Sequence, residues 1–356
     1  MKTMTTHERI TRMYEHREAD RIPVLDYPWK ATLERWAREG MPDGVDYADY
    51  FELDCISAIG ADNSPRFPVR TIEETEEHRI YTSPWGVTMK QWKHAASTPE
   101  FLDFTIVDRP SWEKAKARMA PTADRIDWEH LKNTYAARRK RGDWISAGFW
   151  FGFDVTHSWM VGTERLLTAL ADDPEWCMDL FGTHLDMHLA LFEQIWQAGY
   201  TFDEIHWPDD MGYKGTPFFS TGMYRDLLKP FHRKAVEWAH AHGIKARLHS
   251  CGNINPLIPD LLDIGLDALN PLEVKAGMNP TELKKTVGDR LVLHGGVNAV
   301  LWDTLPAIEA EMERVIPVMK AGGGYIFSSD HSVPSSVSFD GFRRIVERAK
   351  ELGSYA

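Results

Sequence analysis

The chain has few cysteines, no excess of basic residues and no long apolar run. Its 356 residues include three cysteines, too few for a disulfide framework. The formal net charge of −12 argues against a surface for nucleic acid or anionic membrane, because both require clustered Lys and Arg. No run approaches the roughly 18 apolar residues of a membrane span, and residues 1–12 are too polar for a signal peptide. We therefore expect a reduced, cytoplasmic protein.

The composition is that of an ordinary globular protein. Hydrophobic residues make up 43% and charged residues 26%, enough to bury a sizeable core. No internal repeat, low-complexity tract or linker divides the sequence, so we expect one domain over residues 1–356.

Short apolar runs alternate with amphipathic helical stretches from about residue 144 onward, which predicts parallel strands joined by helices. Two more strands are expected earlier, at 22–25 and 55–59, which makes eight, the number that closes a (β/α)8 barrel. A doubly wound open sheet is the competing architecture, but no glycine-rich phosphate loop follows the first strand. We therefore predict an α/β protein, a (β/α)8 TIM barrel with an N-terminal helical segment and a β-hairpin inserted at 81–93. The six later strands are expected at 144–148, 202–207, 246–249, 268–270, 291–294 and 324–327. Helices are expected at 162–198, 220–242, 279–287, 304–321 and 339–352, and the helix that follows strand 246–249 is expected to end at 264.

A metal site is indicated at the C-terminal strand ends, where (β/α)8 barrels place their chemistry. His249 and Cys251 are two residues apart, so both side chains point to one face of an extended segment. His331 follows the last strand. Two histidines and one cysteine would bind zinc and leave one tetrahedral position open, as catalytic zinc requires. A buried cysteine beside a hydrogen-bonded histidine is the plain structural alternative.

Other polar residues at the same end are candidates for catalysis or binding. Asp209 and Asp210 are expected to hold a substrate hydroxyl, act as general acid or base, or join the metal site, unless they only cap a helix. Glu273 is a candidate for the fourth zinc position. The remaining candidates, for contact with a cofactor, are Asn253, His294 and Gly295.

Aromatic residues gather after the third strand. They are either pocket walls or core, and core packing is the more common role. The residues are Trp150, Phe151, Phe153, His157 and Trp159.

The sequence His249-Ser-Cys251-Gly252, with Gly323 to Ile326 leading into His331, resembles the uroporphyrinogen decarboxylase superfamily. Within it the chain resembles the zinc- and corrinoid-dependent methyltransferases. That resemblance implies a (β/α)8 barrel, with zinc held by a His-x-Cys pair and a later cysteine, here replaced by His331. The decarboxylases keep an arginine-rich, tetrapyrrole-binding segment after the first strand, and residues 22–30 lack it.

The resemblance implies a methyltransferase that uses Zn2+ and works with a corrinoid (cobalamin) on a partner protein. One thiolate and two imidazoles leave a zinc site near +1, which favours activation of a leaving group. We therefore expect methyl transfer from a methylated substrate, for example an O-methyl ether, to the cobalt of the corrinoid protein. Three alternatives stay open: methylation of a thiol or folate by a methylcorrinoid, a decarboxylase, and a non-catalytic zinc- or ligand-binding accessory barrel.

Overall fold

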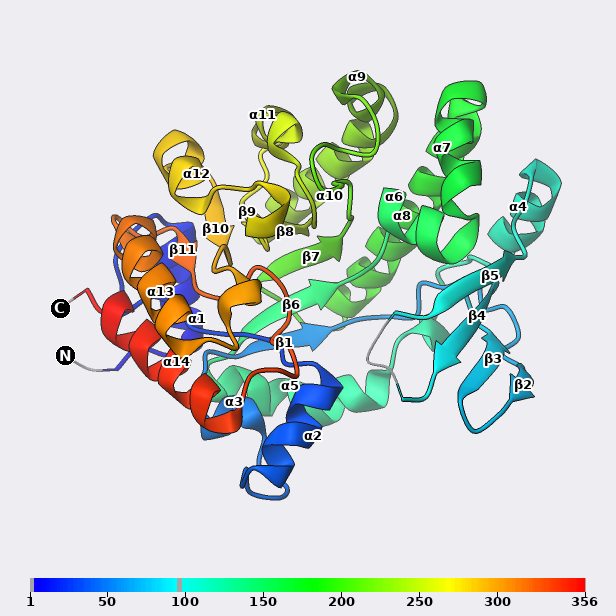
Figure 1. The fold of residues 1–356 in the computed structure, drawn as a ribbon. Coiled ribbons are helices and arrows are strands. Elements are labelled where there is room, and N and C mark those ends of the chain that lie inside the picture. The colour runs from blue at the N-terminus through cyan, green and yellow to red at the C-terminus, as the bar shows by residue number, and fades with distance from the viewer. Residues whose placement is uncertain (1–2, 95–97, 356) are drawn as a thin grey trace.

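A curved sheet of seven parallel strands forms the centre of the computed structural model, which describes residues 3–94 and 98–355 (Figure 1). The strands are neighbours in the order in which they occur in the chain, as expected for a barrel. They are β1 (Ile56–Ile59), β6 (Trp144–Gly148), β7 (Glu204–Pro208), β8 (Lys245–His249), β9 (Ala268–Asn270), β10 (Val292–His294) and β11 (Tyr325–Ile326).

The gap between β11 and β1 is closed by the first predicted strand, which is irregular. Val24 forms a single parallel bridge with Phe327, and the N–H of Phe327 donates to the carbonyl of Pro23 at 2.9 Å. On the other side, the N–H of Asp54 donates to the carbonyl of Val24 at 2.8 Å. Pro23 has no N–H to donate, so this segment cannot form a longer ladder. The predicted (β/α)8 barrel is confirmed, with a short first strand.

The end of the barrel at which its strands begin is covered by the first helix, α1 (Thr6–Tyr14). Its Ile10, Met13 and Tyr14 form an apolar cluster with Trp144 and Val292, the first residues of β6 and β10. Burial of these side chains fixes α1 across the N-terminal strand ends. The C-terminal strand ends remain available for a functional site.

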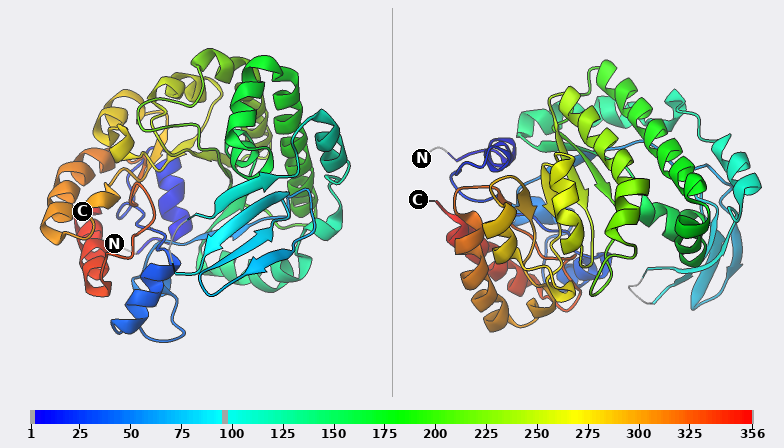
Figure 2. Two further views of the ribbon diagram at one scale, coloured as in Figure 1. Left: turned by 45° about the vertical axis from the view of Figure 1, so that its right-hand side comes forward. Right: turned by 90° about the horizontal axis from the view of Figure 1, so that it is seen from above.

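Helices surround the sheet, and both termini lie on the same side of the molecule (Figures 1 and 2). The helix predicted over 162–198 is divided in two, because Pro174 lacks an N–H and Asp173 caps the second part by accepting from the N–H of Trp176. None of the described helices is long and apolar enough to cross a membrane. The remaining helices are α2 (Lys30–Arg38), α3 (Tyr47–Tyr50), α4 (Arg109–Lys116), α5 (Trp128–Arg141), α6 (Phe153–Val155), α7 (Thr163–Asp172), α8 (Pro174–Gln197), α9 (Thr221–Met223), α10 (Lys229–Ala241), α11 (Ile258–Asp263), α12 (Pro280–Val287), α13 (Leu305–Lys320) and α14 (Phe339–Gly353).

The inserted hairpin belongs to a larger, four-stranded antiparallel sheet on the side of the barrel opposite α13 and α14 (Figure 1). Its strands are β2 (Thr71–Glu74), β3 (His78–Thr82), β4 (Val87–Trp92) and β5 (Glu100–Phe104). The predicted hairpin corresponds to β3 and β4. Val87 and Met89 of β4 are buried, while Phe101 of β5 contacts Trp159 in the segment after β6. The inserted sheet therefore reaches the barrel mouth.

Candidate functional site

Three potential metal ligands meet where β7 and β8 end. His249 is the last residue of β8, Cys251 follows it, and Asp210 follows β7. The Nε2 atom of His249 lies 3.4 Å from Sγ of Cys251 and 3.6 Å from Oδ1 of Asp210. The three ligand atoms all lie within 4.8 Å of one another. One nitrogen, one sulfur and one carboxylate oxygen thus converge at the barrel mouth, and we call these three residues the ligand cluster.

Hydrogen bonds from backbone N–H groups join the loop after β8 to side chains of the loops after β7 and β9. The N–H of Cys251 donates to Oδ1 of Asp210 at 2.8 Å, and the N–H of Gly252 donates to Oε2 of Glu273 at 2.6 Å. Gly252 has a φ of +81°, and a Cβ there would overlap the backbone of Gly212 in the loop after β7. Glycine is therefore required at 252 both for the turn and for the close approach of the two loops.

The protonation states of the cluster suit zinc. Burial lowers the pKa of His249, so its imidazole is neutral and offers a lone pair. Burial, followed by the nearby charges of Asp210 and Glu273, raises the pKa of the Cys251 thiol well above its usual value. A cation among these groups would favour the thiolate, because it reverses the local field. The set of nitrogen, sulfur and oxygen donors is one that zinc accepts.

Two cavities adjoin the cluster, and Asp210 and Cys251 contribute to the walls of both. The first, which we call the aromatic cavity, has a volume of about 850 Å³ and is bordered by Phe101, Trp150, Trp159, Tyr213 and Phe218. The second, the polar cavity, has a volume of about 490 Å³ and is bordered by residues of the barrel interior, among them Ser146, His206, Arg247, His249, Asn270 and His294. The cluster is therefore accessible from two sides.

The polar cavity contains buried hydrogen-bonding atoms that no described residue satisfies. They are Oγ of Ser146, Nε2 of His206 and Nδ1 of His294. Burial lowers the pKa of both histidines well below the ordinary value, so both are neutral. Buried polar atoms normally have partners, which indicates that this cavity holds water or a polar part of a ligand.

Two predicted site residues, His331 and Asp209, lie outside the ligand cluster. His331 borders the polar cavity and stacks on Trp29, with 6.0 Å between ring centroids, but it is not a member of the cluster found among the described residues. Asp209 is fully buried; Oδ1 accepts from the N–H of Asp154 and Oδ2 lies 2.9 Å from Nε2 of His232. Its carboxylate therefore supports the loop after β7, and of the two predicted aspartates Asp210 is the one that borders the cavities.

The remaining candidates, Glu273, Gly295 and Asn253, lie in different surroundings. Glu273 borders the aromatic cavity, accepts from Gly252 and lies 3.3 Å from Nζ of Lys275. Gly295 approaches the backbone of Pro271 and not a cavity, so its role is close packing between strands. Asn253 accepts hydrogen bonds from Asn255 in its own turn.

Sequence reasoning missed Asp154 and Asn270. Asp154 borders the aromatic cavity, and burial, together with the charges of Asp210 and Asp209, raises its pKa to about 7. In the sequence, its neighbours Trp150 and Trp159 stand out only as aromatic residues. A single aspartate at the start of a helix is usually a cap, so Asp154 gives no separate signal. Asn270 ends β9 and was visible as a polar residue in a barrel strand, a position expected to face the mouth.

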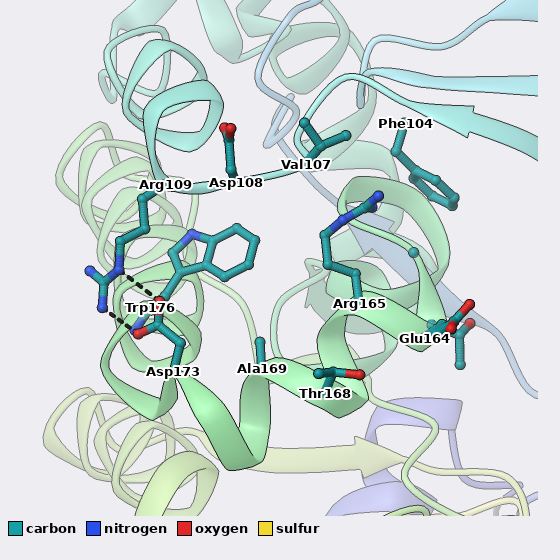
Figure 3. Close-up of a pocket in the computed structure, with 12 residues that line it drawn as sticks. Phe104, Val107, Asp108, Arg109, Glu164, Arg165, Thr168, Ala169, Asp173 and Trp176 are labelled. Carbon is teal, nitrogen blue, oxygen red and sulfur yellow. Dashed lines mark hydrogen bonds and ion pairs between the residues drawn. The ribbon is translucent and has the colours of Figure 1, made fainter.

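A third cavity, of about 770 Å³, lies away from the ligand cluster between α4 and α7 (Figure 3). Arg109 and Asp173 on its wall form an ion pair, with Nε of the arginine 2.8 Å from the carboxylate. None of its lining residues belongs to the ligand cluster. We therefore place the candidate active site at the barrel mouth.

Comparison with known proteins shows the family of the chain. The sequence profile of the uroporphyrinogen decarboxylase (URO-D) family matches residues 115–352. The chain belongs to the URO-D family. This matched region contains the whole ligand cluster and every strand of the barrel except the first predicted strand and β1.

Solved structures resemble this URO-D family member to different extents. A methyltransferase from Methanosarcina mazei aligns with 99% of this chain and 100% of its own, with a TM-score of 0.68 and 17% identity, which establishes the shared fold. A sugar phosphate isomerase/epimerase from Parabacteroides distasonis covers 63% of this chain and 77% of its own, with a TM-score of 0.32 and 13% identity. A xylose isomerase-like TIM barrel protein from Mycobacterium smegmatis covers 70% of this chain and 92% of its own, with a TM-score of 0.34 and 13% identity. No curated protein matches the sequence.

Proposed function

We propose that this protein is a zinc-dependent methyltransferase that moves a methyl group from a small methylated substrate to the cobalt of a corrinoid bound by a partner protein. The observation that carries the proposal is the ligand cluster of Asp210, His249 and Cys251, exposed to two cavities at the barrel mouth. Membership of the URO-D family and the fold shared with a methyltransferase support it.

His249 and Cys251 are the first two proposed zinc ligands. The geometry favours Asp210 as the third, because its carboxylate already lies 3.6 Å from His249. His331, the third ligand expected from the sequence, borders the polar cavity and is not a member of the ligand cluster of the described residues. Three protein ligands would leave one position for substrate, as in catalytic zinc sites.

Substrate demethylation is the direction that we propose. When bound, zinc supplies Lewis acidity that weakens the bond between the methyl carbon and its heteroatom. In transfer from an O-methyl ether, the carbon–oxygen bond breaks, the carbon–cobalt bond forms with the electron pair of cobalt(I), and the oxygen keeps its bonding pair and takes a proton from solvent as the product leaves. Asp210, His249 and Cys251 would hold the zinc, and the aromatic cavity would exclude water from the reacting atoms.

The reverse assignment, methylation of a thiol by a methylcorrinoid, is favoured by one observation. With Asp210 and Cys251 both anionic, the protein ligands neutralise Zn2+, whereas a site with His331 in place of Asp210 would keep a charge near +1. A neutral site preserves electron density on a bound thiolate, which keeps it nucleophilic.

Decarboxylation of a porphyrinogen is disfavoured by the cavity walls. Such a substrate carries several carboxylates and requires several free cationic groups. Among the described residues that border the two mouth cavities, Arg247 is the one arginine, and both its Nε and Nη2 atoms donate to Glu204, at 2.9 and 2.6 Å. The lysines at these walls are Lys214 and Lys275, and Nζ of Lys275 lies 3.3 Å from Glu273. A purely structural zinc site is also disfavoured, because structural sites are closed by four protein ligands.

The proposal is tested by mixing the zinc-loaded protein with cob(I)alamin and candidate methyl ethers while recording the absorbance of methylcobalamin. We expect methylcobalamin to form with at least one ether and not with the Cys251→Ala variant. If none forms with any ether although zinc occupancy is confirmed, the proposed direction is wrong. Thiol-dependent loss of methylcobalamin in the same assay would establish the reverse reaction.

A further inference from the structure

The aromatic cavity is assembled from segments far apart in the sequence. Phe101 comes from β5 of the inserted sheet, Trp159 from the segment after β6, and Phe218 from the loop after β7. The ring of Trp159 lies 5.6 Å from that of Phe101 and 5.3 Å from that of Trp150. These residues are only half-buried, although rings elsewhere in the barrel are buried completely. Their remaining surface faces the cavity.

The cavity has the size and position of a substrate pocket. Its volume of about 850 Å³ lies within the range of small-molecule sites. Cys251 and Asp210 form part of its wall, so a molecule held among the aromatic rings extends directly to the ligand cluster. Phe101 of the inserted sheet also borders the cavity, and this sheet is an addition to the eight strands of the barrel.

We propose that the aromatic cavity binds the ring of an aryl methyl ether, with the methoxy group directed at Asp210 and Cys251. This inference rests on the proposed function and names its substrate class. Offset or edge-to-face contacts with Phe101, Trp150 and Trp159 would hold an aromatic ring more tightly than a saturated ring of the same size. The inserted sheet thus supplies substrate specificity through Phe101.

Charged groups of both signs border the cavity. They are Asp154, Asp210, Glu273, Lys214 and Lys275, and Nζ of Lys275 lies 3.3 Å from Glu273. The Asp154 carboxylate accepts from Nε1 of Trp150 at 3.0 Å and from Oγ of Ser158 at 3.3 Å, so it is anchored in the wall.

A quaternary ammonium ligand would also suit aromatic rings and carboxylates. However, its nitrogen has no lone pair through which a Lewis acid could activate the methyl group. The proposed zinc chemistry therefore selects the neutral aryl ether.

The test is a calorimetric comparison of three probes: methoxybenzene, methoxycyclohexane and choline. We expect methoxybenzene to bind about three- to ten-fold more tightly than methoxycyclohexane. Phe101→Ala should weaken methoxybenzene binding by a similar factor, and Trp159→Leu should do the same. Leu102→Ala is the matched control, because Leu102 is next to Phe101 on β5, is 44% exposed and does not border the cavity.

Equal affinity for the aromatic and saturated rings, tighter binding of choline, or equal effects of Phe101→Ala and Leu102→Ala would each overturn the inference. The titrations are repeated with the zinc-free Cys251→Ser variant, in which ring binding should persist. Ring binding without methyl transfer by the wild type would contradict the proposed function and leave the ring site standing. Methyl transfer from aliphatic ethers without any preference for the aromatic ring would contradict the ring site and leave the proposed function standing.

Discussion

The side-chain amide of Asn270 on β9 donates a hydrogen bond to Nδ1 of His249 on β8, with 3.0 Å between the nitrogen atoms. A neutral imidazole that accepts at Nδ1 carries its proton on Nε2, the atom that faces Cys251. Zinc binding at Nε2 requires this proton to move to Nδ1, and Asn270 must then present its oxygen. Arg247 lies on the far side of the amide, with Nη1 3.4 Å from Oδ1 of Asn270.

The first prediction concerns this pair. Asn270→Asp should raise zinc affinity by about ten-fold, because a carboxylate accepts from both His249 and Arg247. Asn270→Leu should lower the affinity by about 10- to 100-fold, because Nδ1 loses its partner. Competition with a chelator measures both values. Unchanged affinity in both variants would show that Asn270 does not support the metal ligand.

The second prediction separates Asp210 from His331. Asp210→Asn and Cys251→Ala should each reduce zinc content below half occupancy at equimolar metal, because each removes an anionic donor. His331→Ala should retain zinc, because its imidazole stacks on Trp29 outside the cluster. Elemental analysis of the purified variants gives the answer. Zinc loss in His331→Ala with retention in Asp210→Asn would restore the ligand set expected from the sequence.

The barrel could be predicted from the sequence because its strands are buried on both faces and therefore appear as short apolar runs. The predicted strand 246–249 differs from β8 by one residue. The outer strands of the inserted sheet could not be found in this way. All of β2 is exposed, and β5 carries Glu100 and Asp103, so neither shows an apolar pattern.

The ligand cluster was only partly predictable. His249 and Cys251 share one extended segment, so their common direction follows from local geometry. Asp210 had several possible roles, and its position depends on the contact of Gly212 with Gly252, which joins loops about 40 residues apart. Among the aromatic residues, Phe151 and Phe153 are core, whereas Trp150 and Trp159 border a cavity. The sequence cannot separate them, because all four are large and apolar.

The third prediction tests the contact between the two loops. Gly252 and Gly199 both have positive φ, +81° and +90°, but a Cβ at Gly199 would meet nothing within 4 Å. Gly199→Ala should therefore cost about 1–2 kcal/mol of unfolding free energy from backbone strain alone. Gly252→Ala should cost more and should also weaken zinc binding, because Cys251 must move with the loop. Denaturant unfolding of both variants measures the difference. Equal costs and unchanged zinc affinity would contradict the assigned role of Gly252.

The fourth prediction concerns pH and Asp154 in the zinc-free protein. Burial, with the charges of Asp210 and Asp209, raises its pKa from 3.8 to about 7. Between these pH values the folded protein keeps a proton on Asp154 that the unfolded chain has lost, so stability falls as pH rises through this window. The loss is at most about 4 kcal/mol, and Asp154→Asn should remove it. Unfolding free energies are measured from pH 4 to 8. The stability of Asp154→Asn relative to the wild type should increase as pH rises, whereas the difference between the exposed control Asp289→Asn and the wild type should stay constant. A parallel course for Asp154→Asn as well would mean that this carboxylate is ionised in the folded protein throughout the range.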